Sequence, residues 1–401
     1  MFRSSLTPSA LVLATALGSA LTPGCGKGDD ASSPPDGVAC SGVTNATSGE
    51  AVVQGIASAS AGACVVVSGN VTSSTAIAVK SGVTLVGARG ARASITVTDP
   101  AAAGAVSLAD GAALGNVDVL AAPRAGVVVQ GANAKVFDVK VSGAKGSALA
   151  VIAAASPGTV TVERTTLEKS AYGLYAQGEG LDLQLIGGRI AENGGTSLSA
   201  GAGAVIVGGA KVRLEGVTVE KNEGTGVLLD GASTRAVIKG SVVAENRERG
   251  VWAQGLKGTL DQPALMIEDT QLLKNRIVGM GGIELKGIII VGGTVAETVA
   301  SPIPTNLAKT ENIGDGVGIF GGSTDFKIER TNFVSNERAA GVVDGSEVGI
   351  IIVGGKVDPG PGLKFVVQNS TADIQIPEAD RSAPKEPLGI SAPKIELPAA
   401  P

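Results

Sequence analysis

Few residues of the chain have the types and spacing that acid–base or metal chemistry needs. The sequence contains no histidine, the side chain that most often exchanges protons near neutral pH and most often binds zinc. The remaining candidates are Asp230, Glu284 and Lys286 on one strand face, with Asp315 in a nearby turn. Asp230 and Glu284 would lie two turns of a solenoid apart, or roughly 10 Å, whereas a glycosidase pair needs about 5–9.5 Å. The sequence therefore favours surface charges over catalytic residues here.

Aromatic residues give a stronger signal, because one pattern occurs twice. Residues 173–178 read GLYAQG and residues 250–255 read GVWAQG, which places Tyr175 and Trp252 at the same outward strand position. Exposed apolar patches often mark interaction sites, and an aromatic ring can stack on a sugar. We therefore expect a ligand-binding face made of Tyr175, Trp252, Gln177, Gln254 and Leu228. The alternative is that an inserted loop or the C-terminal tail covers this stripe.

Other kinds of chemistry find no support in the sequence. No Gly-x-Ser-x-Gly nucleophile turn or Gly-Lys-Ser/Thr phosphate loop stands out. No tight acidic cluster suggests a metal site, and we predict neither a metal nor a cofactor. The formal net charge of -5 argues against a nucleic-acid partner, which would require a basic face for phosphates.

The elements that carry these residues repeat along the chain. The repeat is an apolar residue, two variable residues, an Asn, a short turn, a Gly and then a strand of alternating apolar residues. Asn222 and Asn246 are 24 residues apart, as are Asn312 and Asn336, a period typical of solenoids. We predict a stacked structural column of Asn193, Asn222, Asn246, Asn275, Asn312 and Asn336. Buried at a corner, such side chains would bond backbone groups, and the following Gly would avoid a crowded Cβ.

Short strands with a period of two predict an all-β chain. Three strands per turn would give a right-handed parallel β-helix of about twelve to fourteen coils over residues 40–371. In this pattern the sequence resembles the right-handed β-helix family, the fold of pectate lyases and polygalacturonases. The resemblance implies a polysaccharide ligand by fold analogy alone. The Gly-His-Gly and Arg-Ile-Lys motifs of polygalacturonase-like members are absent, as is the acidic calcium cluster of the lyases.

The N-terminal segment predicts export. Residues 1–24 read as a lipoprotein-type signal peptide that ends before Cys25, the expected lipidation site; cleavage after Ala20 is the alternative. Residues 25–39 would form a polar tether. Cys40 and Cys64 then remain as a disulfide pair, or as two buried thiols. Residues 372–401 are rich in Pro and predict a tail or strap along the outside.

These features favour an exported lipoprotein, anchored in the outer membrane by its lipid and facing the periplasm or the cell surface. Its β-helix would be a non-catalytic binding or structural module, with a polysaccharide or a surface protein as partner. Two alternatives stay open. One is a polysaccharide lyase or glycoside hydrolase of the pectate-lyase-like fold. The other is an assembly unit built by end-to-end stacking or edge pairing.

Overall fold

The structure is a computed structural model that describes residues 33–90, 92–194, 201–305, 307, 309–345, 348–370, 374–390 and 397. The expected signal segment, the lipidation site at Cys25 and most of the tether lie outside the described residues. Within the described part of the chain, no helix is long and apolar enough to cross a membrane.

One coil shows how the sequence repeat becomes structure. Residues 211–230 form β18 (Lys211–Glu215), β19 (Thr218–Glu220) and β20 (Val227–Asp230). Alternate side chains point inward, so that Leu214, Val219 and Leu229 are buried in one continuous core. A period of two thus fills the interior from three sides, as the sequence predicts.

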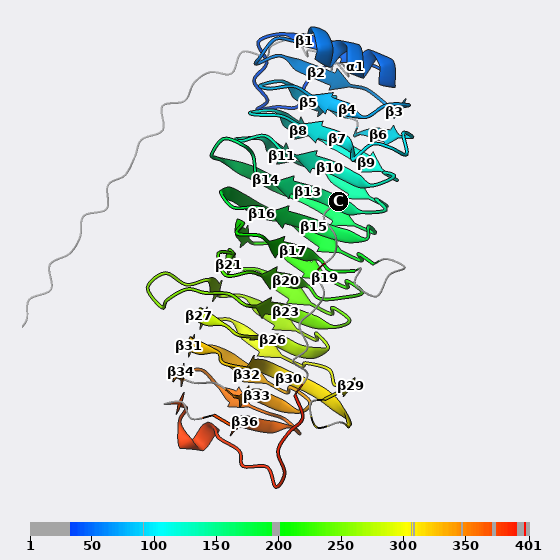
Figure 1. Cartoon of the computed structure of the whole chain (residues 1–401). Coiled ribbons are helices and arrows are strands. Elements are labelled where there is room, and N and C mark those ends of the chain that lie inside the picture. The colour runs from blue at the N-terminus through cyan, green and yellow to red at the C-terminus, as the bar shows by residue number, and fades with distance from the viewer. Residues whose placement is uncertain are drawn as a thin grey trace, which may run out of the picture.

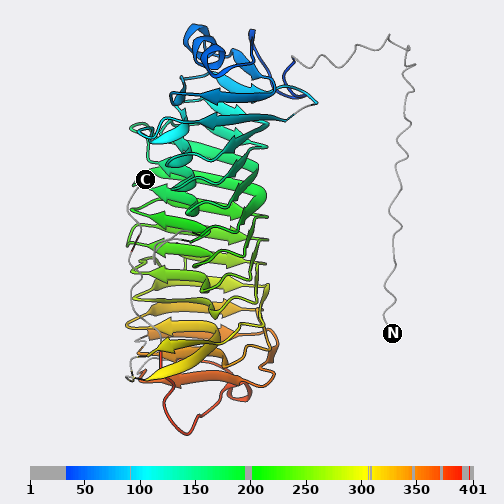
Figure 2. The ribbon, with the colours of Figure 1, turned by 90° about the vertical axis from the view of Figure 1, so that its right-hand side faces the viewer.

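Successive coils stack through three ladders of parallel strands, which build the straight rod of Figures 1 and 2. The first ladder contains β1 (Val43–Ala46), β2 (Cys64–Val67), β5 (Thr84–Gly87), β8 (Ala113–Gly115), β11 (Lys135–Phe137), β14 (Gly158–Glu168), β16 (Leu181–Ala191), β18, β21 (Arg235–Lys239), β24 (Leu265–Glu268), β27 (Lys286–Val291), β31 (Thr324–Glu329), β34 (Val348–Val353) and β37 (Ile374–Gln375). The second contains β3 (Asn70–Ser73), β6 (Ala93–Val97), β9 (Val117–Leu120), β12 (Lys140–Ser142), the far halves of β14 and β16, β19, β22 (Val242–Ala244), β25 (Gln271–Leu273), β28 (Thr294–Ala296), β32 (Asn332–Val334) and β35 (Val357–Asp358).

The third ladder is a separate sheet. It contains β4 (Ile77–Val79), β7 (Gly104–Leu108), β10 (Ala125–Val129), β13 (Ser147–Ile152), β15 (Tyr172–Gln177), β17 (Ala204–Val207), β20, β23 (Arg249–Gln254), β26 (Ile277–Ile283), β30 (Thr310–Phe320), β33 (Ala339–Asp344) and β36 (Leu363–Gln368). A short antiparallel strand, β29 (Ser301–Pro304), pairs with β30. The twelve-strand path of this ladder, counted over the described residues, agrees with the predicted twelve to fourteen coils.

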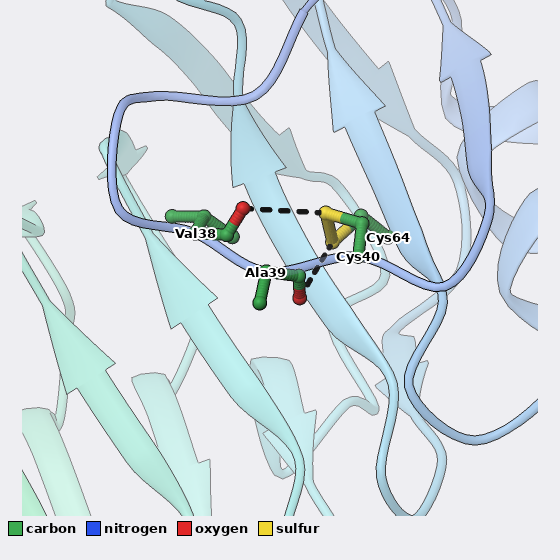
Figure 3. The surroundings of a disulfide bond; sticks show 4 residues. All are labelled: Val38, Ala39, Cys40 and Cys64. Atoms are coloured by element: carbon green, nitrogen blue, oxygen red, sulfur yellow. Dashed lines mark hydrogen bonds between the residues drawn. A yellow bond between two sulfur atoms is a disulfide. The ribbon is translucent and has the colours of Figure 1, made fainter.

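A helix that the sequence analysis did not predict closes the N-terminal end. In α1 (Gly49–Ser58), the Ser48 hydroxyl accepts a hydrogen bond from the Ala51 N–H, and Val52 and Ile56 are buried against the first coils. The predicted disulfide is present beside this cap, with the Cys40 and Cys64 Cα atoms 5.5 Å apart. Figure 3 shows the two sulfur atoms lying near the carbonyl oxygens of Val38 and Ala39.

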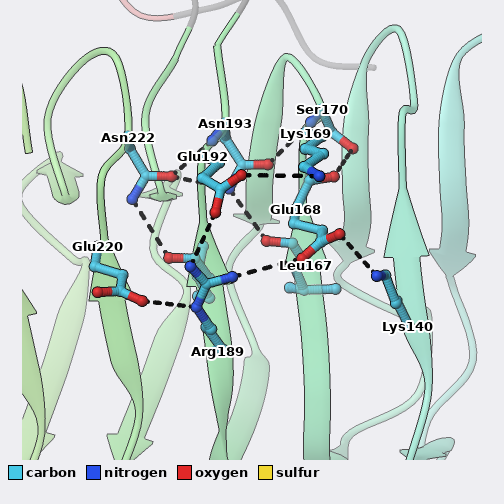
Figure 4. A network of polar contacts seen from close by, with 11 residues as sticks. Lys140, Leu167, Glu168, Lys169, Ser170, Arg189, Glu192, Asn193, Glu220 and Asn222 are labelled. Atoms are coloured by element: carbon cyan, nitrogen blue, oxygen red, sulfur yellow. Dashed lines mark hydrogen bonds and ion pairs between the residues drawn. The ribbon is translucent and has the colours of Figure 1, made fainter.

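The Asn column forms a buried ladder from Asn193 to Asn275. Each Oδ1 accepts from the side-chain Nδ2 of the preceding Asn at 2.9 Å and from its backbone N–H at 3.1–3.2 Å. Ser170 extends the column on one side, because its N–H donates to the Asn193 Oδ1. Figure 4 shows Ser170, Asn193 and Asn222 in line above the ion pairs of Arg189.

The prediction that Asn312 belongs to the column is wrong. Asn312 is exposed in β30, where it pairs with Pro302 across the β29–β30 hairpin. The place in the column belongs to Thr298, which is fully buried and whose hydroxyl donates to the Asn336 Oδ1 at 2.7 Å. The inserted hairpin lengthens this coil, so the 24-residue spacing from Asn312 to Asn336 is a coincidence.

The repeated Gly after each Asn is explained by contact between coils. A Cβ on Gly226 would lie 2.6 Å from the Gly250 carbonyl oxygen and 2.7 Å from the Asn246 Nδ2. Gly250 and Gly316 meet the equivalent atoms of their next coils at similar distances. The position therefore excludes a side chain because a neighbouring backbone occupies the space.

Candidate functional site

The predicted aromatic face has the register that the sequence indicated. Tyr175 pairs with Val205, Val205 with Leu228, and Leu228 with Trp252 along the third ladder. These residues all point outward, since their neighbours in sequence fill the core.

The prediction that this face is exposed to solvent is wrong. Trp252 has no accessible surface, and Tyr175, Leu228 and Gln254 are each 3% exposed. Trp252 packs over Gly281 and within 4.6 Å of the Arg249 guanidinium carbon, measured from its ring centre. A ligand cannot reach these side chains in this arrangement, so their predicted binding role requires the cover to move.

The cover comes from two places that the sequence named as the alternative. Ala202, at the end of the segment inserted before β17, joins the apolar cluster of Tyr175 and Val205. Ile390, from the Pro-rich tail, joins the cluster that contains Leu228 and Trp252. Residues 388–390 of the predicted tail therefore lie over the outer face. Residues 374–376, which the sequence also assigned to the tail, instead continue the solenoid, since β37 pairs with β34 and Ile376 is buried in the core.

The glutamines of the repeated pattern serve the aromatic residues themselves. The Gln177 Oε1 lies 3.2 Å from the Tyr175 hydroxyl, and the Gln254 Oε1 lies 3.4 Å from the Trp252 indole nitrogen. Burial raises the pKa of the Tyr175 hydroxyl, so it stays protonated and can donate this bond. In the repeated pattern, the Gln side chain therefore provides a hydrogen-bond partner for a buried aromatic residue rather than a surface on which a sugar could stack.

The candidate acids do not assemble into a catalytic group. Asp230 is half-buried at the end of β20, Glu284 is exposed, and Lys286 faces Asp325 with 3.7 Å between nitrogen and oxygen. The sequence placed Asp315 in a turn, but it is fully buried within β30 and paired with Arg338. Among the described residues, no group of three or more acidic or cysteine side chains could hold a metal ion.

An open cationic groove, which the sequence did not predict, lies on the first ladder. Two adjoining hollows of about 370 and 380 Å³ share Arg235 and Gln262. One also contains Lys211 and Arg213, and the other contains Lys257 and Lys286. The loop after β23 forms one wall and projects from the rod between β21 and β27 (Figure 1).

Strand register assembles these charges. Lys211 pairs with Arg235 on the next coil, and Lys257 forms a bridge with Lys286 on the coil after. Because coils repeat every 4.8 Å or so, the four cations follow one another along the rod over roughly 14 Å. The signal was present in the sequence as basic residues at the start of successive first-ladder strands, but the insertion after β23 hid their alignment.

Three of the five groove cations are available to a ligand, because Arg213 pairs with Glu215 at 2.7 Å and Lys286 with Asp325 at 3.7 Å. Within the described part of the chain, Lys211, Arg235 and Lys257 have no carboxylate within 4.0 Å; Arg235 donates to the carbonyls of Ala232 and Thr234, and Lys257 to that of Glu284. Asp182 lines one end and accepts from the Thr159 hydroxyl. The groove therefore has a positive field with amide and hydroxyl groups beside it, the chemistry that binds a hydroxyl-rich anion.

Comparison with known proteins identifies the fold. Residues 125–294 match the family described as right-handed β-helix region. The chain has a right-handed β-helix fold. No curated protein sequence matches it.

Several solved structures resemble the chain at low sequence identity. The Dettilon tailspike protein is 13% identical with a TM-score of 0.53, over 82% of this chain and 68% of the tailspike. An α-1,3-glucanase catalytic domain in complex with tetrasaccharides is 11% identical with a TM-score of 0.49, over 87% and 68% of the two chains. The A-module of a mannuronan C-5 epimerase from Azotobacter vinelandii is 13% identical with a TM-score of 0.45, over 84% and 94%.

Proposed function

We propose that this chain is an exported, lipid-anchored β-helix that binds an acidic polysaccharide in the cationic groove and does not cleave it. The observation that carries the proposal is the row of Lys211, Arg235, Lys257 and Lys286 on successive coils. A linear polyanion with regularly spaced charges could meet each cation in turn. The chain has a net charge of -5, so a row of cations stands out from its surroundings.

The binding role is favoured over a catalytic one by what surrounds the groove. Among the described residues, Asp182 is the single carboxylate that lines the two hollows, and it accepts a hydrogen bond from the Thr159 hydroxyl. A hydrolase needs two carboxyl groups across the scissile bond. Export and lipidation at Cys25 rest on the N-terminal sequence pattern, and they would place the groove where extracellular polysaccharides occur.

The test compares binding and turnover in the full-length chain. Immobilised acidic and neutral polysaccharides would be probed with the wild-type protein and with the double variant Arg235→Gln/Lys257→Gln. Removing two surface ion pairs should weaken binding of an acidic polysaccharide about tenfold, because each is worth up to about 1 kcal/mol. Lys145→Gln removes an exposed cation outside the groove and should leave binding unchanged.

Turnover is measured on the same samples as release of reducing or unsaturated ends. We expect none from the wild-type protein. Release that is lost in the double variant or in Asp182→Asn would replace the binding proposal with the polysaccharide-cleaving alternative. Equal binding by all three proteins would show that the groove is not the site.

A further inference from the structure

The end of the described tail is held by side chains that bond its backbone. The Gln368 Oε1 accepts from the Leu388 N–H at 2.9 Å, while its Nε2 donates to the Leu388 carbonyl at 2.7 Å. One side-chain amide thus satisfies both backbone groups of one residue. This is how a binding site recognises an extended peptide, since it engages the chain irrespective of the side chain.

The next residue is bound in the same way by charged groups. The Glu311 Oε2 accepts from the Gly389 N–H at 2.9 Å, and Arg338 donates to the Gly389 carbonyl at 2.7 Å. Arg338 is itself fixed by the fully buried Asp315. A Cβ on Gly389 would lie 2.6 Å from the Thr305 hydroxyl oxygen, so the site accepts glycine alone without rearrangement.

Ile390 completes the contact by packing into an apolar cluster. That cluster contains Leu228, Trp252, Phe320 and Val342 from the outer face of the third ladder. If Ile390 left, this face would lose part of its cover, and apolar surface of this kind tends to find a partner.

The strap is attached at two separate points. The first is at the last coil, where the Ser382 N–H donates to the Phe365 carbonyl and Arg381 bonds Ile374 and Ile376. The second is the contact of residues 388–390. Between them, no hydrogen bond holds residues 383–387 to the described solenoid, and all but Pro384 are exposed. The second contact can therefore open without disturbing the first.

We propose that residues 388–390 are a releasable latch, and that the site beneath them also binds the same residues of a second copy of this chain. The site selects an apolar–Gly–apolar segment by its backbone, and every copy carries that segment. In one molecule the short linker gives a high effective concentration, so the latch closes on its own chain. Release followed by exchange would join two rods by a domain swap.

Trp252 is a built-in reporter for the latch, because it is the only Trp of the chain and shares the cluster of Ile390. The full-length chain would carry Cys25→Ser, which prevents lipidation. Gly389→Val should shift Trp252 emission to longer wavelength and raise its quenching by acrylamide several-fold, with an unchanged far-ultraviolet circular dichroism spectrum. Lys385→Ala, in the linker, is the control and should change neither. Emission that stays unshifted in both Gly389→Val and Ile390→Asp would overturn the latch.

Exchange is tested by shortening the linker. Deleting residues 383–386 leaves two residue steps between Ser382 and Leu388, which span at most about 7 Å. The strand from Phe365 to Gln368 that they must follow is roughly 10 Å long. The latch then reaches a second copy more readily than its own chain, and light scattering should detect a dimer in which Trp252 stays shielded. Adding Gly389→Val should return the deletion variant to a monomer. A monomeric deletion variant, whatever its fluorescence, would overturn the exchange.

Discussion

Replacing Asn222 by Ala tests the account of how the coils are held together. The Asn222 Oδ1 accepts from the backbone N–H and the side-chain Nδ2 of Asn193, at 3.1 and 2.9 Å. Its Nδ2 donates to the Asn246 Oδ1 at 2.9 Å and faces the Ile190 carbonyl at 3.4 Å. Asn193, Asn222 and Asn246 have no accessible surface, so water cannot replace the lost bonds.

The size of the effect follows from the groups that lose partners. Two buried donors of Asn193 lose their acceptor, and an unsatisfied buried group costs about 1–3 kcal/mol. The Asn193 Nδ2 keeps a bond to the Leu167 carbonyl, which limits its share. We therefore expect Asn222→Ala to lower the free energy of unfolding by about 2–4 kcal/mol.

The loss of stability would be measured both by urea unfolding and by hydrogen exchange, because a solenoid can open locally without unfolding as one unit. Protection should fall first in the coils next to residue 222. Asn312→Ala is a matched control: the sequence put Asn312 in the same column, but its side chain is exposed in β30. That variant should change stability by no more than about 0.5 kcal/mol. Equal effects of the two substitutions would refute the structural role of the column.

Three further outcomes are expected. Reduction of the Cys40–Cys64 disulfide, which closes a loop of sequence separation 24, should destabilise the N-terminal coils by roughly 3 kcal/mol, measured as a shift in thermal unfolding with and without reductant. Gly226→Ala should destabilise the chain by at least about 2 kcal/mol in urea unfolding, because its Cβ would overlap the next coil's backbone; a neutral result would show that the coils can separate there. The hydrogen bond from Arg164 lowers the pKa of the Asp138 carboxyl, so its contribution is present above about pH 4 and disappears as pH falls through the lowered value. Both side chains are more than a third exposed, so Asp138→Asn should cost less than about 1 kcal/mol at neutral pH and nothing at low pH, as thermal unfolding across that range would show.

The repeating parts of this molecule could be predicted from the sequence because each coil obeys the same local rules. Alternating apolar residues, a corner Asn and a small Gly recur at nearly constant spacing, and Asn193, Asn222, Asn246 and Asn275 stack as expected. The prediction failed where the spacing is interrupted. The β29–β30 hairpin moved Asn312 out of the column, and α1 belongs to no repeat.

The candidate sites were harder to predict, because they depend on segments that lie outside the repeat. The register of Tyr175 and Trp252 followed from the pattern, but their burial depends on the tail and an insertion that cross the face from elsewhere in the sequence. The cationic groove needs the register of several coils and the loop after β23 at once. A one-dimensional pattern does not contain either relationship.

The central claim is that the row of cations gives this β-helix its ligand, and one binding titration tests it most directly. The full-length chain would be titrated with an acidic polysaccharide and with the same polysaccharide after its carboxyl groups have been reduced to alcohols. The account predicts binding to the acidic form alone, weakening as salt is raised because the exposed charges are screened. Equal binding of the two forms, or binding to neither, would contradict it.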